Sequence, residues 1–205
     1  MRQTITFKEI LQEEEIKTYI RRADLSLERM GFTEHSFAHV MRVSKCAGDM
    51  LQQLGYDEHD VELARIAGYM HDIGNVINRI DHAQSGAIMA FRILDKMGMQ
   101  YEDIAKIIAA IGNHDESTAF PVSDVAAALI IADKSDVRRS RVRNADKSSF
   151  DIHDRVNYAV TENHVSLSDD HTSLILSLTL DTEISPVIEY FEIFLTRMNL
   201  CRRAA

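Results

Sequence analysis

The sequence predicts a mostly α-helical fold with a small antiparallel β-hairpin or sheet and a closing helix near its C-terminus. Two observations support this prediction. Apolar residues recur at helical spacing through most of the first 150 residues. Beyond Phe150 they alternate with polar residues, as they do in strands that are buried on one face. We therefore predict a helical domain over residues 1–150 and an appendage packed on it, a small β-hairpin plus helix, over residues 151–205.

Composition narrows the class of protein. A chain of 205 residues with 45% hydrophobic and 27% charged residues is ordinary for a globular protein. Its net charge of −9 argues against general nucleic-acid binding, so a phosphorylated substrate would depend on local positive charge. We see no membrane-spanning run and no secretory signal, and we expect a cytoplasmic protein without a membrane partner. Cys46 and Cys201 are isolated, which predicts two reduced thiols.

The N-terminal helices begin with a capping box at Thr6-Phe7-Lys8-Glu9, and an apolar stripe then continues to Ala23. We expect Met30-Gly31 to end this helix and Thr33 to cap the next one. That next helix carries His39 at the border of its apolar arc, from which an imidazole can face a cleft.

Two neighbours of His39 have open roles. His35 lies one turn earlier and either supports His39 or is exposed at the helix start, and we favour the exposed position. Arg42 lies almost one turn later. It either reaches a bound phosphate or forms a surface ion pair.

The stretch Tyr69-Met70-His71-Asp72-Ile73-Gly74 places an imidazole beside a carboxylate at a helix end. Residues 58–71 have helical periodicity, and Gly74 is expected to end the helix in the left-handed conformation. Histidine and aspartate together suit a divalent transition metal such as Mn, Fe, Zn, Co or Ni. Taken alone, such a pair is more often a helix-end histidine beside a solvated turn residue.

Three further acidic or imidazole side chains lie at places that suit metal ligation. His82 opens another helix, with Asp81 as the expected N-cap and Gln84 at the capping-box position. His114 closes the helix that begins near Tyr101. Asp133 lies inside an apolar helix that Ser123 begins, where an unpaired carboxylate would be costly. A neighbouring cation would remove that cost.

A basic segment follows Asp133. Residues 134–147 hold six basic and two acidic residues in a chain that is otherwise acidic. Lys134 and Arg138 are the candidates for drawing phosphate oxygens toward the metals, because arginine forks match phosphate geometry. A solvated basic face is the equal alternative.

Alternating residues in the C-terminal part predict two or three strands, within residues 156–160, 165–167 and 174–180, with a turn at 168–172. Ser185-Pro186 is expected to start the final helix, as N-cap and first-turn proline. So small a sheet is marginal alone. It must pack on the helical domain or pair with a second chain, which would make a homodimer.

The histidines and aspartates form an ordered set that resembles the HD superfamily of metal-dependent phosphohydrolases, over roughly residues 30–145. The resemblance implies an HD-type helical bundle that binds one or two divalent metal ions. It also implies that one ion is held by the first histidine, the adjacent His-Asp pair (the doublet) and the last aspartate. Two added histidines hold a second ion, and the aspartate of the doublet bridges the two ions. On this chain the first set is His39, His71, Asp72 and Asp133, and the second is His82, His114 and Asp72.

The resemblance further implies hydrolysis of a phosphomonoester or phosphodiester in a small, nucleotide-like substrate, with Asp72 essential for catalysis. Two departures qualify this expectation: Asn75 stands where many two-metal relatives have a lysine, and Asp115 stands where some have a second histidine. The chain also lacks the Gly-Tyr-Pro signature of the cyclic-dinucleotide phosphodiesterases, so their substrate is not implied. We expect two metal sites of unequal affinity. In the one-ion alternative, His82 and His114 contact the substrate.

Two other classes of function stay open at this point. Some HD-fold proteins with two irons are oxygenases, and the ligand set alone does not separate them from hydrolases. A non-catalytic sensor domain that keeps the metal site is the other alternative.

Overall fold

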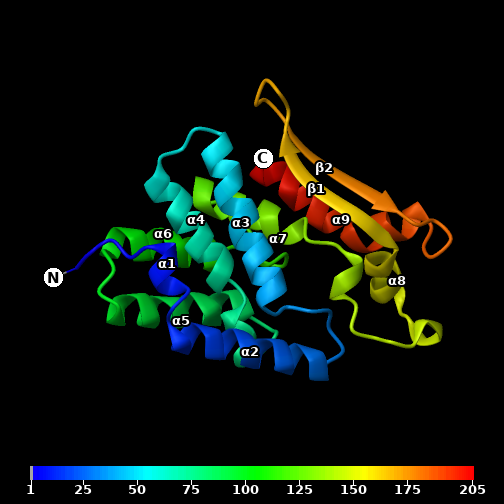
Figure 1. The fold of residues 1–205 in the computed structure, drawn as a ribbon, viewed down its shortest axis with the longest axis horizontal. Helices are drawn as coiled ribbons and strands as arrows, with labels where there is room; N and C mark the ends of the chain where they lie inside the picture. Colours follow the sequence, from blue (N-terminus) through cyan, green and yellow to red (C-terminus); the bar gives the residue numbers. More distant parts are fainter. Residues whose placement is uncertain (1) are drawn as a thin grey trace.

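A computed structural model describes residues 2–205, and it confirms the mostly helical architecture with a two-stranded antiparallel sheet (Figure 1). The longer helices are α2 (Glu14–Arg29), α3 (Phe37–Gln53), α4 (Glu58–Met70), α5 (His82–Lys96), α6 (Tyr101–Gly112), α7 (Asp124–Lys134) and α9 (Val187–Ala204). The short elements are α1 (Phe7–Ile10), α8 (Ile152–Ala159), β1 (Val160–Leu167), β2 (Leu174–Leu180) and the 3-10 turns η1 (Ile73–Val76), η2 (Arg139–Arg141) and η3 (Lys147–Ser149).

The core lies where α3, α4 and α7 pack together, with α5 and α6 against them (Figure 1). Helix α7 is buried along most of its length because Val125 to Ala132 is almost wholly apolar. Helices α3 and α4 approach closely at Gly68, where a Cβ atom would lie 2.7 Å from the Cα atom of Ser44. Burial of apolar faces is the main force that holds such a bundle together.

The N-terminal helix differs from the prediction. The capping box of Thr6 and Glu9 is present, but it opens a single turn, and a second helix begins at Glu14. Thr33 is not the cap of α3. The N-cap residue is Ser36, because the backbone of Glu34 bonds to Arg141 and holds the preceding residues outside the helix.

Two capping predictions near the doublet are also wrong. Gly74 does not have a positive φ; it is required for space, since its Cβ would lie 2.0 Å from the carbonyl oxygen of His82. Asp81 is the N-cap residue of α5 as predicted, but its backbone is left-handed and its side chain makes no capping hydrogen bond. The side chain of Gln84 bonds to Gly112 and Thr118 instead of closing a capping box.

The C-terminal part keeps the predicted order, with two corrections. Residues 156–159, where we predicted a strand, belong to helix α8, which Asp151 caps by accepting from the backbone N–H of Asp154, and Val160 begins β1. Strands β1 and β2 then pair in antiparallel register from Val160 with Leu180 to Leu167 with Leu174. Helix α9 starts one residue later than predicted, with Pro186 at its N-cap.

Tyr190 of α9 packs with Val137 and Val156 in a second, smaller core, to which the hairpin also contributes. The boundary at residue 150 stays a prediction. Within residues 2–205, no helix has the length and apolar character needed to cross a membrane.

Candidate metal centre

The six candidate ligands converge in the interior although they come from five segments. His39 lies on α3, His71 and Asp72 end α4, His82 begins α5, His114 follows α6, and Asp133 lies in the last turn of α7. Five of them are buried and Asp133 is partly buried. The ends of α4, α5 and α6 meet here, so side chains that are distant in sequence share one site.

Four donors form a compact cage. The Nε2 atom of His39 lies 3.6 Å from Oδ2 of Asp72 and 3.3 Å from Oδ1 of Asp133. The Nε2 atom of His71 lies 3.3 Å and 3.6 Å from the same two oxygens. Neighbouring ligands of an ion with bonds of about 2.1 Å lie about 3.0 to 3.4 Å apart in octahedral or tetrahedral geometry. The cage therefore has the dimensions of a first coordination shell.

The orientation of the imidazoles agrees with this interpretation. Each Nδ1 atom has a partner that can accept its proton: Asp136 Oδ2 for His39, and the carbonyl oxygens of Gly68, Arg79 and Ile111 for His71, His82 and His114. A proton on Nδ1 leaves the lone pair of Nε2 available to a metal. The buried Nε2 atoms of His39 and His71 have no hydrogen-bond partner, which is costly unless a ligand satisfies them.

A second group of donors lies on the other oxygen of Asp72. Oδ1 is 3.5 Å from Nε2 of His82 and 4.0 Å from Nε2 of His114, and these two nitrogens are 3.2 Å apart. Asp72 thus presents one oxygen to each group, as a bridging carboxylate does. Two other side chains compete with a metal ion for the donor atoms of this second group. Nδ2 of Asn75 lies 2.9 Å from Oδ1 of Asp72, and Nη1 of Arg79 lies 3.3 Å from Nε2 of His82.

The electrostatics of the centre keep the carboxylates charged. Burial opposes ionisation, yet the neighbouring His71 lowers the pKa of Asp72 well below its usual range, and Lys134 does the same for the pKa of Asp133. Burial lowers the pKa of His114 to about 3, so its imidazole is neutral and able to ligate.

Asp136 is a residue of the site that the sequence analysis missed. Its Oδ2 accepts the Nδ1 proton of His39 at 2.7 Å, and its side chain is almost fully buried. Its Oδ1 accepts a hydrogen bond from Nε of Arg138 at 3.0 Å and lies 3.1 Å from Nε of Arg42 in an ion pair. The available signal was its position three residues after Asp133, close to one helical turn.

Two of the three predicted substrate-binding residues therefore have another partner. Arg42 and Arg138 bind Asp136 and do not line the pocket at the metal centre, whereas Lys134 does. His35, which we expected to be exposed, is partly buried and lines the pocket. Its ring centre lies 5.3 Å from that of His39.

The centre opens into a pocket of about 270 Å³. Three arginines that we did not predict line it: Arg79, Arg141 and Arg197. Arg141 and Arg197 face Asp136 and Glu116, whereas Arg79 has no carboxylate partner within residues 2–205. The guanidinium of Arg79 is therefore the pocket cation that is most available to an anionic ligand.

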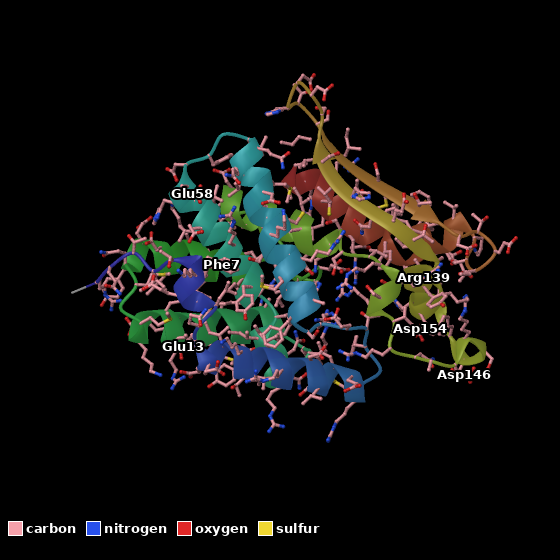
Figure 2. The ribbon with its side chains drawn as sticks, viewed as in Figure 1. Phe7, Glu13, Glu58, Arg139, Asp146 and Asp154 are labelled. Atoms are coloured by element: carbon pink, nitrogen blue, oxygen red, sulfur yellow. The ribbon has the colours of Figure 1, made fainter. Side chains whose placement is uncertain are left out.

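The outer wall of this pocket comes from the C-terminal part. Asp151, Asp154 and Asn157 of the α8 segment line it, together with Phe194 of α9. Figure 2 labels Asp154 near Arg139 on the side of the molecule that lies away from Phe7 and Glu58. The predicted appendage thus contributes to the site rather than only packing on the helical domain.

Comparison with known proteins adds independent findings. The family model of the HD domain matches residues 36–151, more than half of the chain. An uncharacterized protein of Methanocaldococcus jannaschii is 24% identical in an alignment of 170 positions that covers 72% of this chain and 65% of that protein. Ribonuclease Y of Bacillus thuringiensis is 30% identical over 122 residues, which are 60% of this chain and 22% of that enzyme.

A solved structure is also similar. The crystal structure of a predicted HD superfamily hydrolase from an uncultured Thermotogales bacterium is 26% identical, with a TM-score of 0.49, over 65% of this chain and 75% of that one. Among the curated relatives, the matched part spans just under two thirds of the archaeal protein and less than a quarter of ribonuclease Y.

Proposed function

Because the chain belongs to the HD domain family, we propose that it hydrolyses a phosphomonoester or phosphodiester of a small substrate with the help of divalent transition metal ions. The observation that carries this proposal is the cage of His39, His71, Asp72 and Asp133, whose facing donor atoms lie 3.3 to 3.6 Å apart. His82 and His114 would hold a second ion with Asp72. Mn, Fe, Co, Ni and Zn all suit imidazole and carboxylate ligands.

A bound ion would supply a water of lowered pKa and positive charge beside the phosphoryl oxygens. The protein's own contribution is to place a phosphate next to it. Arg79 adds a guanidinium that has no carboxylate partner within residues 2–205, on the side of His82, and Lys134 adds an ammonium group whose Nζ lies 2.8 Å from Oδ2 of Asp133. Preorganised cations of this kind stabilise negative charge as it develops in the transition state.

The size and charge of the pocket favour a small, nucleotide-like substrate. A volume of about 270 Å³ is walled on one side by α8 and α9, which leaves little room for a long polymer. The net charge of −9 also opposes a long nucleic acid. Ribonuclease Y is named for RNA cleavage, so phosphodiesters belong among the substrates to be tested.

The test is a screen of metal-stripped protein reloaded with each of the five metals. The substrates are p-nitrophenyl phosphate, bis-p-nitrophenyl phosphate, nucleoside monophosphates, cyclic nucleotides and a short RNA. We expect metal-dependent release of product, and we expect Asp72→Ala to abolish it. Asp124→Ala, which changes an exposed aspartate at the start of α7, is the matched control and should stay active.

Three outcomes would overturn the proposal. Unchanged activity in Asp72→Ala would reject the assigned site. Oxygen consumption by the iron-loaded protein, with no hydrolysis of any phosphate ester, would favour the oxygenase class. Tight metal binding without turnover in either assay would favour a sensor domain.

A further inference from the structure

Strand β2 is an edge strand that lacks the features that usually protect such strands from pairing with another chain. Its sequence, Leu174-Ile175-Leu176-Ser177-Leu178-Thr179-Leu180, has no charged residue and no proline. Within residues 2–205, β1 is the one strand that pairs with it, and the irregularity of the hairpin lies on β1 between Val160 and Glu162. Natural proteins usually protect an edge strand with charges, proline or a bulge. None of these devices is present on β2.

The two edges of the hairpin differ. The outer side of β1 is partly covered, since α3 and α8 pack against this strand and the carbonyl oxygen of Asn163 accepts a hydrogen bond from Nη2 of Arg42 on α3. The hairpin lies along one side of the molecule, with β2 running beside β1 (Figure 1). The outer edge of β2 is therefore the one where another strand can add.

The backbone direction shows which groups β2 offers. The carbonyl oxygen of Ser173 accepts from the N–H of Ser168, and the N–H of Asp181 donates to Ala159, so both residues point toward β1. Backbone groups alternate in direction along an antiparallel strand. The groups that point away from β1 therefore belong to the four leucines of β2: Leu174, Leu176, Leu178 and Leu180.

The sequence of β2 is nearly the same in both directions about Ser177. In an antiparallel pair of two β2 strands related by a twofold axis at Ser177, Leu176 lies opposite Leu178, and Leu174 lies opposite Leu180. These are the residues whose N–H and C=O groups point outward, so each pair can exchange two hydrogen bonds. A register shifted by one residue would set an outward residue against an inward one and would lose these bonds.

We propose that two copies of this chain associate through β2, which joins their hairpins into one four-stranded antiparallel sheet. A second copy fits this edge because an interface on a twofold axis must complement itself, and β2 does so in both side chains and backbone. Cross-strand partners lie on one face of a sheet. The side chain of Leu176, which is 38% exposed, thus gains the apolar contact of the partner's Leu178.

Sedimentation equilibrium of the 205-residue chain tests the proposal. We expect a dimer, and we expect Leu176→Pro to weaken it by about tenfold or more, because proline removes an outward N–H on both copies. The hydrogen bonds between β1 and β2 stay intact, because the N–H of Leu176 points away from β1. Unchanged circular dichroism and metal content will show that the variant is folded.

A charge swap at the axis makes the test specific. Ser177→Lys sets two lysines opposite each other, and we expect the dissociation constant to rise by up to about fivefold, as for Ser177→Glu. A mixture of the two variants should dimerise more tightly than either alone. His164→Lys, on β1 opposite Ser177 within the hairpin, is the matched control and should behave like the parent protein.

Three results would overturn the proposal: a parent protein that is monomeric at every accessible concentration, a dimer that Leu176→Pro leaves unchanged, or variants at Ser177 that gain nothing on mixing. A misfolded variant cannot imitate the recovery on mixing. The proposal does not depend on the hydrolytic function, because none of its measurements uses enzyme activity.

Discussion

The Nδ1 atom of His39 lies 2.7 Å from Oδ2 of Asp136, and both side chains are buried. This contact fixes the ring so that Nε2 faces the carboxylates of Asp72 and Asp133. A carboxylate behind a ligating histidine also raises the basicity of the ring. Asp136 therefore acts on the metal centre without being one of its proposed ligands.

Removal of this carboxylate should weaken metal binding. In Asp136→Asn the uncharged amide still fills the space, and we expect the affinity of the tighter site to fall by about 10- to 100-fold. Competition with a chromophoric chelator measures the change. Arg138→Ala removes another partner of Asp136 without touching His39 and should have a much smaller effect. Equal losses in both variants would contradict the specific role of the His39 contact.

Metal titration should separate the two groups of donors. We expect two equivalents per chain, with the His39, His71, Asp72 and Asp133 site filling first, because Asn75 and Arg79 compete at the second group. His82→Ala and His114→Ala should each bind one equivalent less. If both bind as much metal as the parent, one ion is the correct count, and these histidines belong to the substrate.

Arg79→Ala should reduce kcat/KM for a phosphate ester by about 10- to 100-fold, because it removes the pocket cation without a carboxylate partner. Steady-state kinetics measure the loss. Arg79→Lys should recover part of the activity. Arg42→Ala removes an arginine that binds Asp136 outside the pocket, so its KM should stay near that of the parent.

The fold should be sensitive to volume at Gly74. A methyl group there would lie 2.0 Å from the carbonyl oxygen of His82, so Gly74→Ala should cost about 3 kcal/mol of unfolding free energy and displace a proposed ligand. Urea unfolding monitored by circular dichroism measures the cost. Gly112→Ala, whose added carbon meets only the Cβ of Ala87 at 3.6 Å, should be neutral or stabilising. Similar costs at the two positions would count against a local steric cause.

Asp136 should also make stability dependent on pH. Burial opposes its ionisation, but the hydrogen bond from His39 and the charge of Arg141 keep its pKa below the ordinary value of 3.8. The folded state therefore binds this proton less readily than the unfolded state, and the stabilisation present at neutral pH is lost as the pH falls below that value. Asp136→Asn should show a shallower loss over the same range in denaturant titrations. An identical slope in both proteins would exclude Asp136 as the source.

The sequence could predict the helices and the set of histidines and aspartates that converge in the interior, because both depend on local pattern and residue type. His82 and His114 lie at or near the helix ends where they were expected. The sequence could not show whether the region of Val156 and Val160 is a helix or a strand, because residues four apart lie on one side of a helix and also fit the alternation of a strand. The partner of Arg42 depends on how α3 packs against the segment after α7, which no local pattern describes.

The proposed ligands and the pocket wall occupy different parts of the chain. All six candidate ligands lie within residues 36–151, which match the HD domain, whereas Asp154, Asn157 and Phe194 lie beyond that range. Substitutions in α8 and α9 can therefore change which molecule the pocket accepts while the candidate metal centre stays as it is. In such a protein the last quarter of the chain can change the preferred ligand, while the earlier residues keep the candidate metal ligands in place.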